Sequence, residues 1–414
     1  MQEFFKTETI QERVLLIGVG TGEADDTDGS LDELEELADT AGAITAGKII
    51  QSREAVHPGT YIGKGKIEEV RSLMLAVDAT GIICDDELSP AQMNNLEHEL
   101  ECKVMDRTLL ILDIFAKHAT TSEGKIQVEL AQLRYRSARL VGLRASLSRL
   151  GGGIGTRGPG EKKLETDRRL IRKRITALKE ELSQVERHRE LLRTGRSRGN
   201  LKTAAIVGYT NAGKSTLLNA LTGSQVLSQD KLFATLDPTT RSLTLEDGQQ
   251  LLLTDTVGFI RKLPHNLVEA FKSTLEEAKY ADYIIHVADV SNPQVELQMH
   301  VVYDTLRELG ADGKKTITVF NKQDVAGDVT VRDLRADYTV KTSAKTGEGL
   351  QELQELLGKL ISEELLYVER VFPYQEAGKI QLIRENGQLL SEEYTENGIH
   401  VKARVPKEIN HKVI

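Results

Sequence analysis

A glycine-rich segment with the spacing of a phosphate-binding loop follows a short apolar run and precedes a helical pattern. Glycines allow the backbone to curl so that successive N–H groups point at one phosphate, and the following helix adds its positive N-terminal end. We predict that Lys214 bridges the β- and γ-phosphates of a nucleotide and that the Ser215 hydroxyl ligates Mg²⁺. The expected phosphate-binding residues are Gly208, Tyr209, Thr210, Asn211, Ala212, Gly213, Lys214 and Ser215.

A second motif of the DxxG type comes after another apolar run and comprises Asp255, Thr256, Val257 and Gly258. A carboxylate at this position holds Mg²⁺ through water, and the glycine amide can donate to the γ-phosphate. We therefore expect these four residues at the nucleotide, with Asp255 at the metal and Gly258 at the γ-phosphate.

Two further motifs indicate that the base is guanine. Asn321, Lys322, Gln323 and Asp324 match the pattern NKxD, and Ser343, Ala344 and Lys345 follow the next short strand. The Asp324 carboxylate can accept from both N1–H and the 2-amino group of guanine, donors that adenine does not present in that arrangement. A backbone N–H of the second motif can meet guanine O6.

The segment between these motifs must hold the threonine that completes Mg²⁺ coordination when the γ-phosphate is present. Thr235, Thr239 and Thr240 are candidates, and the residues alone do not choose between them. Phe259 stands after Gly258, where a water-positioning Gln is common, so we expect slow intrinsic hydrolysis that a partner or ion assists. Asn211 is a candidate for holding K⁺ beside the phosphates; the alternative is a loop Asn that stabilises its own turn.

The elements that must position these motifs are short apolar strands that alternate with helices, which predicts an α/β fold. Residues 201–364 are expected to form a P-loop GTPase domain with a doubly wound, mostly parallel sheet, because each motif follows a strand and ligands bind at that edge. The expected strands are Lys202–Val207, Leu251–Thr254, Thr316–Phe320 and Tyr338–Lys341.

The remaining sequence predicts three further regions. Residues 1–125 alternate strands and helices and should form a small parallel α/β domain, in which Gly18 to Gly22 is either a weak second nucleotide site or an ordinary turn. Residues 126–200 should form a hairpin of two long antiparallel helices, with a glycine-rich loop at 151–160 and a linker from Arg193. Residues 365–414 should form a small β-rich α+β domain with hairpin turns at Asn386-Gly387 and Asn397-Gly398.

Composition narrows the class of protein. The 414 residues include no uncharged apolar run of the roughly 18 residues that span a bilayer, and the first residues lack the apolar centre of a secretory signal. We therefore expect a cytoplasmic protein. Two cysteines are too few for a disulfide framework or a zinc site. From Arg134 to Asn200 nineteen Lys or Arg stand against seven Asp or Glu in a chain of net charge −9, which indicates either RNA binding or a solvated helical face.

Several segments together resemble the HflX GTPases, a ribosome-associated family of P-loop proteins. The resemblance covers nearly the whole chain, and its segments are Tyr61–Lys66, Asp106–Asp113, Gln127–Leu133, Gly152–Glu161 and Phe233–Pro238. The glycine loop is the most specific, although Lys162-Lys163 stands where members often have Thr-Gln. The resemblance implies that Thr235 is the Mg²⁺ threonine, acting with Lys214 and Gly258 in catalysis, and that the nucleotide meets Phe233, Ala234, Thr235, Leu236 and Asp237.

The resemblance also implies a partner. We expect GTP and GDP as substrate and product, binding to the 50S ribosomal subunit through the basic hairpin and the glycine-rich loop at rRNA, and splitting or rescue of stalled or idle ribosomes under stress. We expect a monomer. The alternative is a GTP-sensing scaffold of low turnover that docks on protein or membrane partners.

Overall fold

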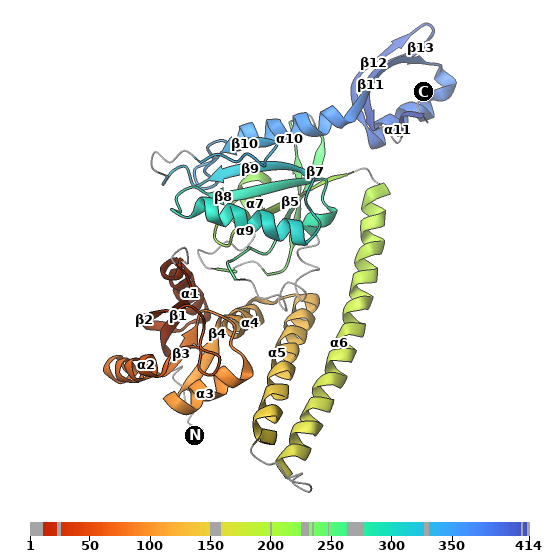
Figure 1. Ribbon diagram of the computed structural model, residues 1–414. Helices are drawn as coiled ribbons and strands as arrows, with labels where there is room; N and C mark the ends of the chain where they lie inside the picture. The colour runs from red at the N-terminus through yellow and green to blue at the C-terminus, as the bar shows by residue number, and fades with distance from the viewer. Residues whose placement is uncertain are drawn as a thin grey trace, which may run out of the picture. The chain divides into compact units, whose positions relative to one another are not determined.

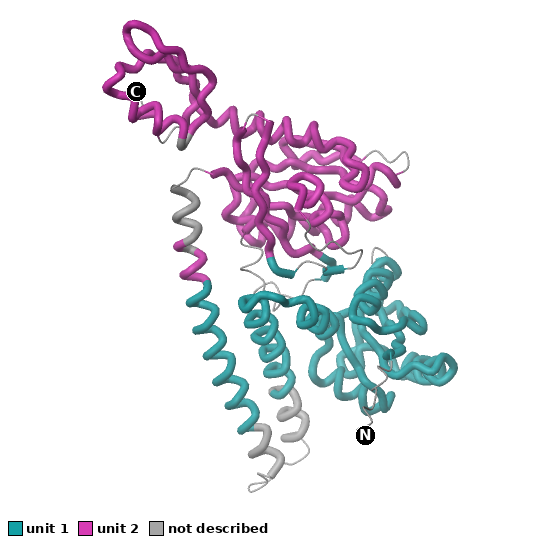
Figure 2. The backbone as a smooth tube through the Cα atoms, turned by 180° about the vertical axis from the view of Figure 1, so that it is seen from behind, with its two compact units in different colours: residues 1–185, 229–237, 260–273 teal, residues 186–228, 238–259, 274–414 magenta. Residues whose placement is uncertain are grey.

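The structure is a computed structural model of the chain (Figure 1), and it describes residues 11–22, 26–149, 159–198, 201–224, 232–233, 236–246, 248–262, 277–326, 331–406 and 409–411. The chain forms two compact units. Unit 1 comprises residues 1–185, 229–237 and 260–273, and unit 2 comprises residues 186–228, 238–259 and 274–414 (Figure 2). Unit 1 therefore includes two short segments from the part of the sequence that carries the nucleotide motifs. The division into four domains stays a prediction.

Unit 1 is built on a parallel four-stranded sheet with the order β2-β1-β3-β4, as expected from the alternating pattern. Side chains alternate between the two faces of a strand. Leu15, Ile17 and Val19 of β1 pack with α2 and α3, while α1 contacts α4. The elements are β1 (Arg13–Gly20), α1 (Thr27–Ala41), β2 (Ile44–Ser52), α2 (Lys64–Val77), β3 (Gly81–Cys84), α3 (Pro90–Leu100), β4 (Lys103–Asp106) and α4 (Arg107–His118).

Local sequence explains where these helices begin. At α3, the Ser89 hydroxyl accepts from the Gln92 N–H while the Gln92 side chain accepts from the Ser89 N–H, and Pro90 fills the first helical position. This reciprocal capping box satisfies two backbone donors that the helix leaves unpaired. At α4, the Asp106 carboxylate accepts from the Leu109 N–H in the same way.

Two long helices follow, α5 (Ser122–Arg149) and α6 (Pro159–Arg198). Arg174 on α6 pairs with Glu129 on α5 through two bonds of 2.7 and 2.8 Å. The linker expected from Arg193 is wrong up to Arg198, because α6 continues through it; Arg and Leu favour helix, and a single interior Gly costs only about 1 kcal/mol. Likewise, the glycine-rich loop ends before Pro159, since proline is favoured in the first turn of a helix. Residues 151–158 of that loop lie outside the described residues.

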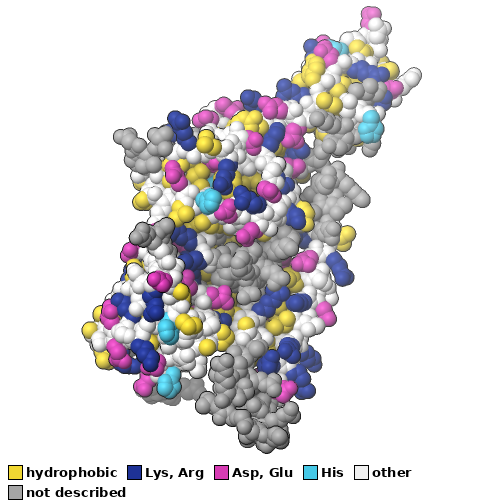
Figure 3. Space-filling view, viewed as in Figure 1, with side chains coloured by type: hydrophobic (Ala, Val, Ile, Leu, Met, Phe, Trp, Pro, Cys, Tyr) yellow, Lys and Arg dark blue, Asp and Glu magenta, His cyan; other side chains and the backbone are white. Residues whose placement is uncertain are grey.

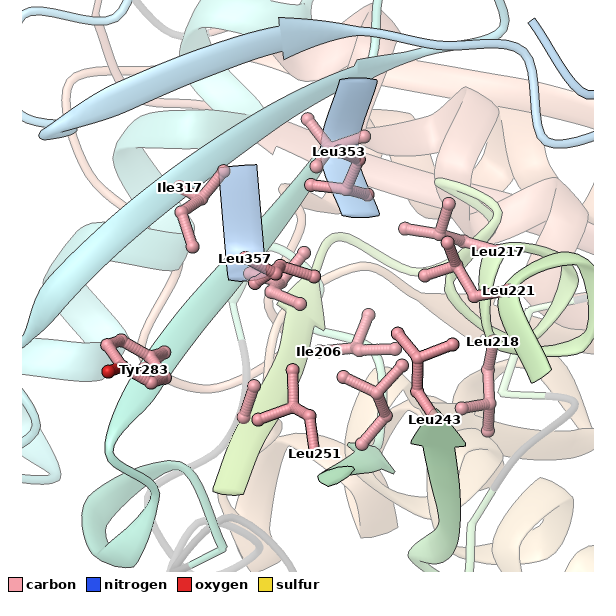
Figure 4. Close-up of a cluster of buried hydrophobic side chains, with 14 of the residues drawn as sticks. Ile206, Leu217, Leu218, Leu221, Leu243, Leu251, Tyr283, Ile317, Leu353 and Leu357 are labelled. Carbon is pink, nitrogen blue, oxygen red and sulfur yellow. The ribbon is translucent and has the colours of Figure 1, made fainter. Parts of the chain in front are cut away.

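Unit 2 contains a six-stranded sheet in the order β10-β9-β8-β5-β7-β6, parallel except for β6. Figure 4 shows the apolar cluster that joins this sheet to α7 and α10, with Ile206 near its centre. Helix α9 packs with a second cluster that contains Ala288 and Phe320. The elements are β5 (Lys202–Gly208), α7 (Lys214–Thr222), β6 (Thr239–Thr244), β7 (Gln250–Asp255), β8 (Tyr283–Asp289), α9 (Val295–Glu308), β9 (Lys315–Asn321), β10 (Tyr338–Lys341) and α10 (Leu350–Glu364).

The chain ends in a small antiparallel sheet of order β11-β13-β12 packed on α11. Its elements are β11 (Leu365–Phe372), a 3₁₀ turn (Tyr374–Glu376), α11 (Ala377–Asn386), β12 (Gln388–Thr395) and β13 (Gly398–Pro406). The hairpin turn at Asn397-Gly398 is confirmed, because Thr395 pairs with Gly398. The one expected at Asn386-Gly387 is wrong: Asn386 ends α11, and the Gly387 N–H donates to the Ile383 carbonyl. Among the described residues, no helix combines the length and apolar character that crossing a bilayer requires.

Candidate nucleotide-binding site

The predicted motifs of unit 2 meet at one edge of the six-stranded sheet. Gly208, Asp255, Asn321 and Lys341 end β5, β7, β9 and β10, and these strands are parallel members of the sheet. The carboxyl ends of parallel strands share an edge, which is the ligand side of such folds. The structure therefore brings together the glycine loop, the DxxG motif and both guanine motifs.

The glycine loop depends on close backbone packing. Gly213 has φ of 94°, and a Cβ built there would lie 2.3 Å from Nδ2 of Asn321. Asn211 has φ of 61°, a left-handed conformation that Asn tolerates better than most residues. Asn211 thus has a conformational role in the loop. Helix α7 begins at Lys214, directly after Gly213, which places its N-terminal end at the loop.

Lys214 is buried, and its ammonium group donates to the Tyr209 carbonyl over 2.8 Å. Burial lowers the pKa of Lys214 to about 8, with Asp255 acting in the opposite direction. Burial disfavours the charged form because it removes water from the ammonium group. A phosphate brought to this lysine would favour its charged form.

Ser215, in the first turn of α7, and Asp255, at the end of β7, offer oxygen ligands that lie next to each other. The Ser215 hydroxyl donates to Oδ2 of Asp255 over 2.7 Å. Hydroxyl and carboxylate oxygens are the donors that Mg²⁺ prefers, and Mg²⁺ commonly takes only one or two protein ligands beside phosphates and water. The donor set therefore fits Mg²⁺. The described residues hold no cluster of three or more His, Cys, Asp or Glu of the kind that would cage a metal ion alone.

The segment after Asp255 is joined to the glycine loop by backbone bonds. The Thr210 N–H donates to the Phe259 carbonyl over 2.7 Å, and the Phe259 N–H donates to the Gly208 carbonyl over 3.1 Å. A Cβ at Gly258 would lie 2.7 Å from the Thr210 Cα and 2.9 Å from Nζ of Lys214. Only glycine fits at 258, so its main chain lies directly against Lys214. Phe259 itself is 1% exposed.

The two residues between Asp255 and Gly258 mainly pack. The Thr256 hydroxyl donates to the Ile206 carbonyl over 2.8 Å, and the Val257 side chain is buried. Both residues thus attach the DxxG segment to the sheet rather than presenting polar groups.

At the guanine end, the buried Asn321 side chain connects three segments. Its Nδ2 donates to the Ala212 carbonyl over 3.0 Å, and its Oδ1 accepts from the Ala344 N–H over 3.0 Å and from the Thr342 hydroxyl. Asn321 therefore braces the glycine loop against the Ser343–Lys345 loop. The sequence motif predicts a nucleotide contact for Asn321 but gives no sign of this brace.

Asp324 projects an exposed carboxylate that accepts from the Ser343 hydroxyl over 2.7 Å. This hydrogen bond lowers the pKa of Asp324 below its usual range. The carboxylate is therefore ionised at neutral pH, as an acceptor for guanine N1–H requires. Lys322, with φ of 65°, pairs with Asp289 over 2.8 Å, while Gln323 Nε2 donates to the Phe320 carbonyl over 3.1 Å. Lys345 is exposed.

The predicted residues Phe233, Leu236 and Asp237 belong to unit 1. The Phe233 ring meets the Phe115 ring edge to face at 4.6 Å, and the Asp237 carboxylate accepts from Thr120 and Thr121. Ala234 and Thr235 lie outside the described residues. Of the other candidate threonines, Thr239 and Thr240 lie on β6, where the Thr240 hydroxyl bonds that of Thr254 at 2.9 Å.

One buried ionisable residue near the site has no counterpart in the sequence motifs. His286 on β8 is 1% exposed, lies 3.9 Å from the Asp333 carboxylate and stacks edge to face on Tyr303. Burial lowers the pKa of His286 to about 4, Asp333 opposes this shift, and the charge of Lys214 adds to it. A single His within an apolar strand gives no sequence signal that separates it from other core residues.

In unit 1, the Gly18 to Gly22 segment has the contacts of a turn. Cβ atoms at Gly18 and Gly20 would each lie 2.8 Å from the Thr27 side chain. The Asp26 carboxylate caps α1 by accepting from the Gly29 N–H. An anion would meet this carboxylate, so the contacts favour the turn over a second nucleotide site.

The chain is similar to known proteins along most of its length. Family models described as GTP-binding GTPase N-terminal, GTP-binding GTPase Middle Region and 50S ribosome-binding GTPase match residues 28–116, 118–196 and 203–322. The chain is 66% identical to a GTPase HflX of Lacrimispora saccharolytica, covering 99% of this chain and 97% of the relative. Identity to the GTPase HflX of Escherichia coli K12 is 43%, over 91% and 89%. A crystal structure of a GTP-binding protein from the archaeon Sulfolobus solfataricus in complex with GDP is 25% identical with a TM-score of 0.45, covering 85% of this chain and 99% of that chain.

Proposed function

The chain belongs to the HflX family of GTPases and hydrolyses GTP, and we propose that it couples hydrolysis to binding of the large ribosomal subunit. In this proposal it acts as a cytoplasmic monomer that splits or rescues stalled or idle ribosomes under stress. Support comes from the family model matched by residues 203–322, whose description names 50S ribosome binding.

The observation that carries the proposal is the exposed basic surface of α6. Figure 3 shows Lys and Arg side chains gathered along this helix. Arg169, Arg172 and Lys173 are exposed and follow one another at helical spacing, so they share one side of α6. Basic side chains held on a rigid helix can meet several phosphates of one RNA surface, and such binding releases counterions.

The GTPase chemistry of the chain follows from the site. Lys214 would meet the β- and γ-phosphates, and the Gly258 amide would donate to the γ-phosphate. Ser215 would ligate Mg²⁺ directly and Asp255 through water, with Thr235 as the further ligand that the family resemblance implies. The bound ion would supply positive charge beside the transferred phosphoryl group. Asp324 would select guanine. A K⁺ ion beside Asn211 is also part of the proposal, and equal turnover in K⁺ and Na⁺ buffers would remove it.

The test is sedimentation of the full chain with purified large ribosomal subunits at several salt concentrations, in the presence of a non-hydrolysable GTP analogue. The variant replaces Arg169, Arg172 and Lys173 with Glu. A matched control replaces Lys359, Lys379 and Lys402 with Glu, because these lysines lie on other elements and the net charge changes equally. We expect the α6 variant to bind more weakly and its salt slope to fall by about one for each phosphate that the variant no longer neutralises.

Equal binding by the α6 variant and the wild type would contradict the proposed surface. A parallel assay of phosphate release with and without large subunits distinguishes the alternative function. Strong stimulation supports the ribosome-coupled enzyme, whereas no stimulation supports a GTP-sensing scaffold of low turnover, an alternative that the buried Phe259 favours.

A further inference from the structure

Asp289 and Asn321 lie side by side at the ligand edge of the six-stranded sheet. They end β8 and β9, two parallel strands that are neighbours in Figure 1, and they are paired in register. Just beyond them, the Val290 N–H donates to the Asn321 carbonyl over 3.2 Å. Asp289 belongs to none of the nucleotide motifs, yet it lies next to the NKxD motif in space.

Asp289 contacts Lys322, the second residue of that motif. Oδ2 of Asp289 accepts from Nζ of Lys322 over 2.8 Å. The other oxygen, Oδ1, accepts from the Ser291 N–H over 2.9 Å and from the Ser291 hydroxyl over 2.5 Å. Both oxygens are therefore used, and the bonds to Ser291 fix the carboxylate in its own turn.

The ion pair of Asp289 and Lys322 is partly shielded from water. The Asp289 side chain is 12% exposed and the Lys322 side chain 29%. Fully exposed ion pairs contribute little because water and salt screen them, but a partly buried pair is screened less. Removing the ammonium group would leave a largely buried carboxylate without a cation, which is costly. The pair therefore holds the Lys322 side chain in place.

Lys322 has to be held because its backbone is left-handed. Its φ is 65°, a conformation that crowds the Cβ of any residue other than glycine and persists only where the surroundings maintain it. The Lys322 carbonyl accepts from the N–H groups of Val325 and Ala326, each over 3.1 Å. Lys322 thus starts the turn that carries Asp324, and its conformation sets the direction in which the Asp324 side chain projects.

The Asp324 carboxylate has to be oriented accurately to read a base. Its proposed partners on guanine, N1–H and the 2-amino group, are two donors at fixed positions, and a hydrogen bond weakens steeply as its angle becomes unfavourable. The Ser343 hydroxyl donates to Oδ1 of Asp324 over 2.7 Å. This bond restrains the end of the side chain, whereas the turn at Lys322 determines where the side chain begins.

We propose that Asp289 is a positioning residue for base selectivity, which holds Lys322 in the backbone conformation from which Asp324 reads guanine. Asp289 acts through Lys322 and touches no part of the nucleotide. The inference rests on the guanine role proposed for Asp324. Without the Asp289 charge, Lys322 relaxes towards an ordinary backbone conformation and the Asp324 carboxylate turns away from the 2-amino group. Discrimination between guanine and a base that lacks this group then falls.

The test measures how strongly the full chain prefers GDP to inosine diphosphate, whose base keeps N1–H but lacks the 2-amino group. Each unlabelled nucleotide displaces mant-GDP, with Mg²⁺ present throughout. Asp289→Asn keeps an oxygen that can accept from Ser291 and removes the charge that holds Lys322. Lys322→Met removes the ammonium group and keeps the side-chain length, and a double variant combines both changes.

Two control variants accompany these. Glu364→Gln neutralises the carboxylate of another lysine pair, because Glu364 pairs with Lys202 over 2.7 Å. Lys202 begins β5, so this pair lies at the edge of the same sheet opposite the ligand edge. Asp324→Ala removes the proposed guanine contact itself and gives the preference that remains when the 2-amino group is not read.

We expect the wild type to prefer GDP by about tenfold or more, the effect of one hydrogen bond to a charged group. Asp289→Asn should lower this preference about fivefold, while its affinity for inosine diphosphate stays within about threefold of wild type. The double variant should match Lys322→Met rather than add the two losses, because both changes break one pair. Glu364→Gln should keep the wild-type preference. A merely structural lesion would weaken both nucleotides equally and leave the preference unchanged.

The inference is overturned if Asp289→Asn keeps the wild-type preference within about twofold, or if the losses of the two single variants add in the double variant. If Asp289→Asn does not fold, Lys322→Met is compared with Lys322→Gly. Glycine adopts positive φ without a partner, so Lys322→Gly should keep more of the preference, and an equal loss in both overturns the inference. Asp324→Ala separates the two levels of the argument. A preference unchanged in Asp324→Ala removes the guanine role of Asp324 and the inference with it, whereas a loss in Asp324→Ala without one in Asp289→Asn removes the inference alone.

Discussion

The brace made by Asn321 can be tested by a single truncation. Asn321→Ala removes the donor to the Ala212 carbonyl and the acceptor of the Ala344 N–H, and both of these residues are buried. A buried backbone group left without a partner costs about 1–3 kcal/mol, so two such groups near the mouth of the site should cost about 2–4 kcal/mol together. The bond to Thr342 is longer, 3.3 Å, and adds little.

The loss should appear mainly in nucleotide binding, since the brace joins the phosphate loop to the guanine loop. A change of about 3 kcal/mol corresponds to roughly 100-fold in affinity. The assay is titration with mant-GDP, accompanied by urea unfolding followed by far-UV circular dichroism, because the chain has no Trp to report on folding. Asn95→Ala is the matched control: it removes one exposed amide-to-carbonyl bond in unit 1. An affinity within about threefold of wild type for Asn321→Ala would refute the brace.

Two further predictions concern pH. Burial lowers the pKa of Lys214 to about 8, and phosphates favour its charged form, so nucleotide affinity should fall as pH rises through 8, by up to about tenfold per pH unit. Lys214→Arg keeps its charge, so the mant-GDP affinity of this variant should depend less on pH. A wild-type mant-GDP affinity that does not change with pH would contradict the role of Lys214. Burial lowers the pKa of His286 to about 4 in the folded protein, whereas an unfolded His has a pKa of about 6.5. As pH falls from about 6.5 to 4, the unfolded chain therefore binds the proton first and is favoured. The free energy of unfolding should be highest above pH 6.5 and drop by about 3 kcal/mol across that window. Urea midpoints at pH 7, 5.5 and 4.5 should show this drop for wild type and a smaller one for His286→Gln.

Most of the sheet and the site could be predicted because the signals are local. Each phosphate or guanine motif directly follows an apolar run, and the strands at 202–208, 250–255, 315–321 and 338–341 end where the motifs begin. Parallel strands share a carboxyl edge, so the order of motifs is enough to bring them together. Local patterns do not predict which distant residue each side chain hydrogen-bonds or pairs with.

Two sequence-based predictions were wrong because the same local sequence can form two different structures. Asn-Gly turns a hairpin at 397–398, but at 386–387 the same pair ends α11, because the preceding residues form a helix whose Ile380 and Ile383 are buried against the C-terminal sheet. Packing of α11 on the sheet therefore determines that Asn386-Gly387 ends a helix instead of forming a hairpin turn. Composition alone indicates a linker in the Arg- and Ser-rich stretch after Arg193, yet this stretch continues α6.

The contacts of Lys262 and Asp237 could not be found from the sequence for a different reason. The Lys262 ammonium donates to the Asp85 carboxylate although 177 positions separate the two residues. The Thr120 hydroxyl donates to the Asp237 carboxylate across 117 positions. Neither pair belongs to a periodic pattern or a motif, so no spacing rule links them. The family resemblance assigns Asp237 to the nucleotide, whereas in the structure its carboxylate receives four donors from two threonines.

Phe259 shows how the same architecture limits catalysis. Its side chain is buried, its N–H donates to Gly208 and its carbonyl accepts from Thr210, so position 259 presents no polar group to an attacking water. Replacing it with Gln would place an amide in an apolar site without giving it access to the γ-phosphate. The group that orients the water must therefore come from another part of the chain, from a bound ion or from a partner.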